Sequence, residues 1–230
     1  MNLRPAFTPS AVLAVAVLQF LPADVRAASL PELDGTCLET RLQGCTVLTS
    51  GYIALEQGQR IAFQTQAGFT DADGVKGGVV LFEETPNGWS AFASAFDGYR
   101  YDVPRVVEHD DTLLHVAGYT GGSGAYNADL LFTWGDTGAA HYSEGWIPIE
   151  MEGWLSSIGA LLPEGLEIWQ GVDYDFDDWF YGELNARTPL WRGDDGNCCP
   201  SGGWATIHFA IQNNALVATA IDYQPPAKAK

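Results

Sequence analysis

The chain has 230 residues and a formal net charge of −18, with 29 Asp and Glu against 11 Lys and Arg. So acidic a chain repels nucleic acid and anionic lipid, and neither is an expected partner. Hydrophobic residues make up 47% and aromatic residues 12% of the chain. That composition is enough to build a folded core and argues against a disordered protein.

The first 27 residues have the pattern of a secretory signal peptide. Arg4 precedes an apolar run over residues 11–21, and Val25, Arg26 and Ala27 supply a cleavage site. This run is too short to cross a bilayer, and no later segment approaches the required length. We therefore expect a periplasmic or secreted protein without a transmembrane segment. From residue 28 onward it carries 9 basic against 28 acidic residues, a net charge of −19.

The remaining chain is predicted to consist mainly of antiparallel hairpins. Residues 28–50 hold turn residues and two cysteines and are predicted to form an irregular arm, and residues 225–230 a polar tail. The segment between them, 51–224, is expected to be one β-rich domain. Alternation predicts strands over residues 52–55, 60–65, 78–84, 89–96, 112–119, 128–134, 141–144, 166–176, 184–191, 204–211 and 215–223. Asn87 and Gly88 form a strong hairpin signal.

One amphipathic helix is predicted to interrupt the strands. Its apolar positions repeat at helical spacing at Trp154, Leu155, Ile158, Leu161 and Leu162. Pro163 and Gly165 then mark its end. One helix among many hairpins indicates an α+β protein that is mainly β, with a sandwich-like or barrel-like arrangement of sheets. A small propeller is a further alternative, although no blade-length repeat supports it.

Four cysteines allow three disulfide pairings. A bridge between Cys37 and Cys45 closes the shortest loop and is favoured. It leaves Cys198 and Cys199 as a vicinal pair, which closes only as a small strained ring, or as two thiols. The alternative ties both early cysteines to the late pair. A structural staple in an oxidising compartment is the favoured interpretation of the late pair, with a redox site as the alternative.

Three carboxylates share one face of a predicted strand: Asp173, Asp175 and Asp177. Calcium could neutralise them, which makes them a weak metal-site candidate. Alternatively, if the chain folds back after them, Asp173 lies opposite Arg187 and pairs with it. This solvated face with one ion pair is the favoured interpretation, so no cofactor is expected.

Two loops suggest chemistry only weakly. Residues 71–74 open like a calcium loop but lack its later ligands, and a turn between strands explains them equally well. Ser123, between two glycines, is the nearest approach to a nucleophile elbow. Because it lies between two predicted antiparallel strands, it lacks the strand-to-helix context of such an elbow, and no catalytic residue is assigned.

Trp179, Phe180 and Tyr181 are the predicted binding residues. They fall at a predicted hairpin tip, where three consecutive large rings cannot all be buried. An exposed aromatic tip is a candidate contact surface. Aromatic and acidic residues together suit a glycan or a peptide surface, so the expected partner is an extracytoplasmic protein or a glycan.

The order of motifs in the second half of the chain carries a resemblance. A Gly-Gly-Ser-Gly loop at residues 121–124 is followed by a hairpin, and Asn197, Cys198, Cys199 and Pro200 precede a final hairpin. This order resembles that of uncharacterised secreted bacterial proteins, in which a fuller Asp-Gly-rich loop corresponds to residues 71–74. The resemblance implies an extracytoplasmic bacterial module with a vicinal cysteine pair, and it implies no activity.

The sequence thus predicts an acidic binding domain of unknown ligand that performs no catalysis. One alternative is an extracytoplasmic hydrolase of polysaccharide or peptide, using a pair of carboxylates from Asp173, Asp175, Asp177 and Asp178. Another is a redox protein that uses Cys198 and Cys199.

Overall fold

The computed structural model describes residues 30, 33–56, 58–108, 112–122, 124–138, 144–176 and 183–227. The predicted signal peptide lies outside the described residues. So does the predicted aromatic tip at Trp179, Phe180 and Tyr181. No helix in the described part of the chain is long and apolar enough to cross a membrane.

Strands dominate the structure. The first half contains β1 (Gln43–Ala54), β2 (Arg60–Thr70), β3 (Gly74–Thr85), β4 (Gly88–Ala95), β5 (Arg100–Tyr101), β6 (Arg105–Glu108), β7 (Thr112–Val116), β8 (Gly118–Tyr119) and β9 (Leu130–Asp136). The second half contains β10 (Glu144–Ile149), β11 (Leu166–Glu167), β12 (Asp173–Asp175), β13 (Leu184–Pro189), β14 (Trp191–Arg192), β15 (Trp204–Gln212) and β16 (Ala215–Gln224). The prediction of a mainly β fold is confirmed.

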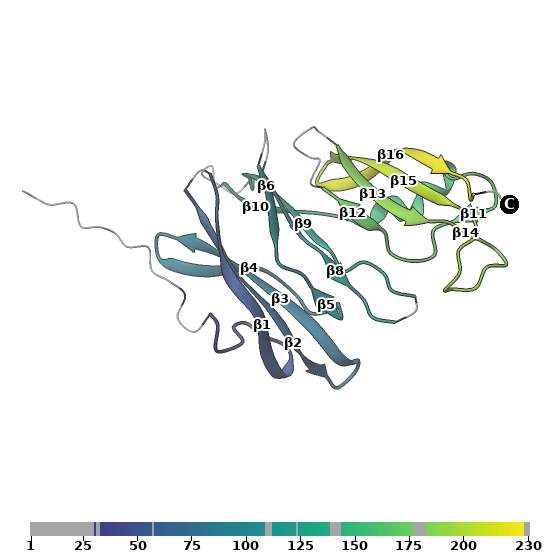
Figure 1. The fold of residues 1–230 in the computed structure, drawn as a ribbon. Helices are drawn as coiled ribbons and strands as arrows, with labels where there is room; N and C mark the ends of the chain where they lie inside the picture. The colour runs from purple at the N-terminus through teal and green to yellow at the C-terminus, as the bar shows by residue number, and fades with distance from the viewer. Residues whose placement is uncertain are drawn as a thin grey trace, which may run out of the picture.

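Three four-stranded antiparallel sheets follow one another across the molecule, with the orders β1-β2-β3-β4, β10-β9-β7-β6 and β12-β13-β15-β16 (Figure 1). Two further pairs of short strands, β5-β8 and β11-β14, form separate two-stranded sheets. Among the described strands every sheet stays open at its edges, so the barrel-like alternative is wrong. The sheets stack on one another as in a sandwich.

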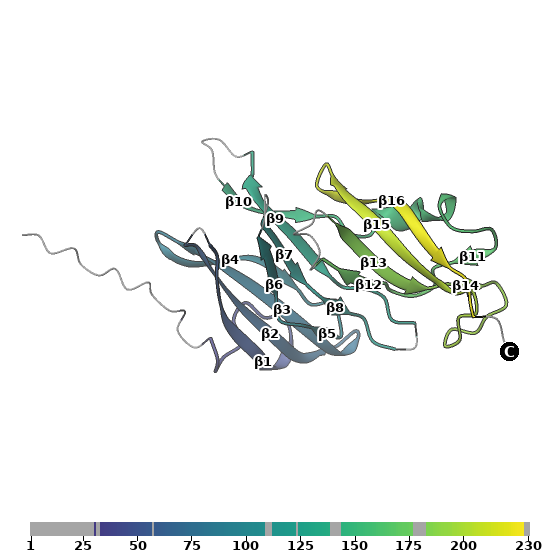
Figure 2. The ribbon, with the colours of Figure 1, turned by 45° about the horizontal axis from the view of Figure 1, so that its top comes forward.

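The middle sheet is covered on both faces (Figure 2). Leu114 and Phe132 pack into a core shared with the β1–β4 sheet, while Leu113 and Leu131 pack into a second core shared with the β12-β13-β15-β16 sheet. Successive side chains of a strand point to opposite faces, so a central strand can serve both cores. All five residues of β7 are buried for this reason. The result is a three-layered arrangement of sheets.

The segment before β1 covers the outer face of the first sheet. Leu33 packs with Val80 and Phe82 in a third core. The predicted bridge between Cys37 and Cys45 is present, with the two α carbons 6.2 Å apart. The arm is shorter than predicted, however, because β1 already begins at Gln43. Its irregular part therefore ends at residue 42.

The predicted amphipathic helix is not formed. Two single 3₁₀ turns, η1 (Gly153–Ser156) and η2 (Ile158–Ala160), occupy its place. Trp154 and Ile158 are buried as the pattern requires, but Leu155 and Leu161 are exposed. The segment contains two glycines and ends at Pro163, which leaves it too short and too flexible to pay the cost of helix nucleation.

Turn residues set the hairpins largely as predicted. The β3–β4 hairpin turns at Pro86 and Asn87, and Gly88, which follows them at the start of β4, has a positive φ of 112°. Residues 71–74 form the turn between β2 and β3, where the backbone N–H of Asp73 donates to the hydroxyl of Thr70. The predicted turn between two strands is therefore present at the acidic loop.

Candidate functional site: an arginine and a tryptophan on the outer sheet

The outer face of the β12-β13-β15-β16 sheet is polar because apolar and polar residues alternate along its strands. On β13, Leu184 and Ala186 are buried while Arg187 is exposed. On β15, Ala205, Ile207 and Phe209 point inward, so the residues between them point outward. These include a tryptophan, Trp204.

The pairing register arranges these outward side chains in rows across the sheet. One row is Asp173, Arg187, Thr206 and Asp222; the next is Asp175, Asn185, His208 and Ala220; a third is Pro189, Trp204 and Gln224. Neighbours within a row lie on strands roughly 4.8 Å apart. The predicted register of Asp173 opposite Arg187 is confirmed.

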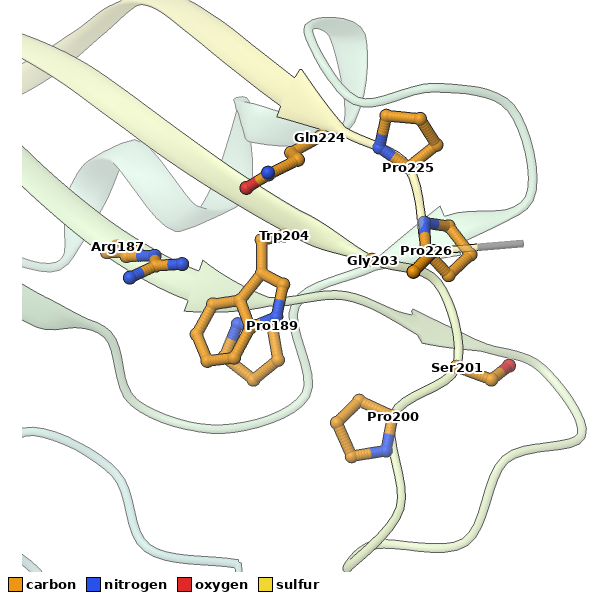
Figure 3. A pocket seen from close by; sticks show the side chains of 10 residues that line it. Arg187, Pro189, Pro200, Ser201, Gly203, Trp204, Gln224, Pro225 and Pro226 are labelled. Atoms are coloured by element: carbon orange, nitrogen blue, oxygen red, sulfur yellow. The ribbon is translucent and has the colours of Figure 1, made fainter. Parts of the chain in front are cut away.

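Arg187 and Trp204 meet at one end of this face. The guanidinium carbon of Arg187 lies 4.5 Å from the centroid of the Trp204 ring, and Trp204 is 43% exposed. The predicted ion pair with Asp173 is not formed, because the arginine leans over the indole. Figure 3 shows Arg187 beside the ring of Trp204. Pro189, the cross-strand neighbour of Trp204, lies next to the same ring. A guanidinium stacked on an aromatic face keeps the N–H groups at its edge free to donate.

A hollow of about 470 Å³ opens around these two side chains (Figure 3). Its lining consists of Arg187, Pro189, Pro200, Ser201, Gly203, Trp204, Gln224, Pro225, Pro226 and Ala227. Five of these ten residues carry apolar rings, and Arg187 is the one charged residue that the described part of the chain contributes to the lining. We call this hollow the Trp204 pocket.

The Trp204 pocket contains polar groups with unused hydrogen-bonding capacity. Within the described residues, neither the guanidinium of Arg187 nor the side-chain amide of Gln224 has a hydrogen-bond or ion-pair partner. Both residues are exposed, so these groups can bond to solvent. A ligand that enters the pocket can therefore bond to Arg187 and Gln224 without first breaking a hydrogen bond within the protein.

Gly203 allows the segment after β16 to lie against the start of β15 and to line the pocket. Gly203 has a positive φ of 93°, and a Cβ at this position would lie 2.3 Å from the backbone carbonyl oxygen of Gln224. Only glycine allows this close approach. It brings Pro225 and Pro226 against the start of β15, so the first residues of the predicted polar tail are a wall of the pocket.

The vicinal cysteines lie in a loop that borders the same pocket. The structure pairs Cys198 with Cys199, and both are exposed. The carboxylate of Asp195 closes the base of the loop by accepting the backbone N–H groups of Arg192 and Ser201, each at 2.8 Å. These hydrogen bonds, led by the one from Arg192, lower the pKa of Asp195. The cysteine loop thereby holds the residues that follow it at the pocket wall.

A second hollow, of about 270 Å³, lies between Asn127, Trp154 and Tyr174. Two of its polar side chains, Asn127 and Tyr174, are bonded within the protein. The Asn127 amide accepts the backbone N–H of Val172 at 2.7 Å and donates to the carbonyl of Val172 at 2.8 Å. The Tyr174 hydroxyl accepts from the Trp154 indole and donates to the carbonyl of Met151, and burial raises the pKa of this hydroxyl. These groups position the core and leave little for a ligand.

The predicted site residues are only partly brought together. Asp173 and Asp175 are exposed on β12, while Asp177 lies outside the described residues. Within the described part of the chain, no three His, Cys, Asp or Glu side chains are grouped to hold a metal ion. The aromatic tip stays a prediction. Sequence reasoning overlooked Trp204, although alternation with buried Ala205 and Ile207 already assigns it to the polar face.

Comparison with known proteins adds no family: no family model matches the chain, and no curated protein does.

Proposed function

We propose that this protein is an extracytoplasmic binding domain that takes its ligand in the Trp204 pocket and does not transform it. The observation that carries this proposal is the position of the Arg187 guanidinium over the exposed ring of Trp204, with its carbon 4.5 Å from the ring centroid. An exposed tryptophan beside a cation that forms no ion pair with the described carboxylates contributes nothing evident to the core. In a binding site, the same two groups supply apolar area and oriented donors.

The extracytoplasmic location rests on two features. Residues 1–27 have the pattern of a secretory signal, and Cys37 and Cys45 are disulfide-bonded. Structural disulfides are rare in reducing compartments. The resemblance to secreted bacterial proteins with a Gly-Gly-Ser-Gly loop and a Cys-Cys-Pro motif supports the same location.

The hydrolase alternative has less support from the geometry. Asp173 and Asp175 lie two residues apart on one strand and point to the same side of the sheet. Asp173 and Asp222 lie at opposite ends of one row, roughly 14 Å apart at the usual strand spacing. Glycoside hydrolysis needs two carboxylates that flank the scissile bond within about 10 Å of each other. A binding role needs no such pair.

A defined array of neutral glycans, acidic glycans and peptides tests the proposal. The mature protein should retain at least one class of probe, and Trp204→Ala should abolish that signal. Trp169→Ala is the matched control, because Trp169 is 44% exposed and does not line the pocket. Binding that survives Trp204→Ala, or a wild-type protein that retains no member of the array, would contradict the proposal.

A further inference from the structure

The chemistry of the Trp204 pocket narrows the class of ligand. Resting on the binding function proposed above, we infer that the ligand is a saccharide that carries a carboxylate, such as a uronic acid unit of a polysaccharide. Three features of the pocket and its surroundings lead to this class: the arginine over the tryptophan ring, the apolar walls, and the carboxylates in the same row of the sheet face as the arginine.

The stacked arginine selects for a carboxylate. The guanidinium carbon of Arg187 lies over the Trp204 ring, 4.5 Å from its centroid, and the guanidinium N–H groups form no ion pair or hydrogen bond with the described residues. Arginine recognises carboxylates through two parallel N–H donors on this edge, and such bonds are about twice as strong as neutral ones. A lysine or an amide at this position would lack that geometry.

The walls select for a compact ring with apolar C–H surface. Trp204 and Pro189 are cross-strand neighbours, and Pro200 and Pro226 line the same hollow. Flat indole and pyrrolidine rings offer rigid apolar area that loses little conformational entropy on binding. The amide of Gln224, from the adjacent strand, adds one donor pair and one acceptor for ligand hydroxyl groups.

The flanking carboxylates distinguish a saccharide from a simple anion or an acidic peptide. Asp173 and Asp222 belong to the same row as Arg187 and are exposed. A ligand that carried only negative charge would be repelled by both. A sugar acid presents its carboxylate to Arg187 and its hydroxyl hydrogens to Asp173, the neighbour of Arg187 in the row, whose carboxylate accepts hydrogen bonds and cannot donate them. The row therefore matches a ligand with both kinds of group.

Titration calorimetry with short probes tests this inference, since short probes limit repulsion from the net charge. The probes are the trisaccharides of galacturonate, mannuronate and guluronate, each compared with its neutral hexose counterpart. At least one uronate should bind about tenfold or more tightly than its neutral counterpart. Arg187→Gln should remove that preference, and Arg187→Lys should restore it only in part. Arg41→Gln, an exposed arginine that does not line the pocket, changes the net charge equally and should preserve it.

The possible failures separate the two proposals. If a neutral sugar or a peptide binds through Trp204 and Arg187→Gln has no effect, the saccharide-acid inference is overturned while the binding function stands. Absence of binding to all three uronates likewise overturns the inference. If probes bind but Trp204→Ala retains them, the proposed site itself is wrong. Thermal unfolding of each variant confirms that the exposed substitutions leave the fold intact.

Discussion

His115 and Asp129 lie against each other between the second and third sheets, with Nε2 of the histidine 2.7 Å from Oδ1 of the aspartate. Their side chains are only 9% and 4% exposed. His208 and Asp222 form a pair of the same kind on the outer face, at 2.9 Å, but there the side chains are 34% and 81% exposed. The two pairs have the same residue types and differ chiefly in burial. Comparing them therefore shows how burial changes the contribution of such a pair to stability.

Asp129→Ala should lower the free energy of unfolding by about 3 kcal/mol or more. It leaves His115 without its partner, and it also removes the acceptor of the Asn127 amide at 3.0 Å. Buried polar groups left unsatisfied cost about 1–3 kcal/mol each. Asp222→Ala should cost less than about 1 kcal/mol, because an exposed pair exchanges its partner for water. Urea denaturation monitored by circular dichroism measures both, and equal costs would contradict this account.

Gln64 fastens the amino-terminal arm to the first sheet. Its side chain is fully buried, accepts the backbone N–H of Leu38 at 2.9 Å and donates to the carbonyl of Thr36 at 2.9 Å. Gln64→Leu should destabilise the protein by on the order of 3 kcal/mol, because these backbone groups lose their partner. Limited proteolysis within residues 33–42 should accelerate. Gln212→Leu, at an exposed position, is the control, and similar proteolysis of both variants would refute the fastening role.

The vicinal disulfide should be reduced before the early one. Adjacent residues hold the α carbons of Cys198 and Cys199 at 3.8 Å, below the usual range for a disulfide, and both cysteines are exposed. The α carbons of Cys37 and Cys45 lie within that range, at 6.2 Å. Graded reduction, alkylation and mass spectrometry should label the late pair at the lower reductant concentration. Earlier labelling of Cys37 and Cys45 would overturn this prediction.

The base of the cysteine loop should open in acid. Hydrogen bonds from Arg192 and Ser201 lower the folded-state pKa of Asp195 below its ordinary value of 3.8. Their contribution is therefore complete above that ordinary value and is lost as the pH falls through the lowered pKa. The amide proton shifts of both donors should titrate together, with a midpoint below 3.8. Asp195→Asn should abolish this shared titration and Asp194→Asn should preserve it; a midpoint above the ordinary value would contradict the assignment.

The sequence by itself determined the features that depend on neighbours along the chain. Period-two alternation identified most of the strands. Asn87 and Gly88 specified a hairpin, and the return of the chain after β12 placed Asp173 opposite Arg187. The short spacing of Cys37 and Cys45 selected their bridge. Each of these follows from backbone geometry over a few residues, which the order of residues already contains.

Only the tertiary structure decided how the sheets stack and where the pocket forms. The apolar run of β7 indicates burial but does not say which sheet covers each face, since that depends on residues far away in the chain. Periodicity predicted a helix around Trp154, yet packing against the third sheet needed only two buried side chains, and two 3₁₀ turns supply them. The Trp204 pocket joins Arg187, Trp204 and Gln224 from three strands. Their meeting depends on long-range register, which no local pattern encodes.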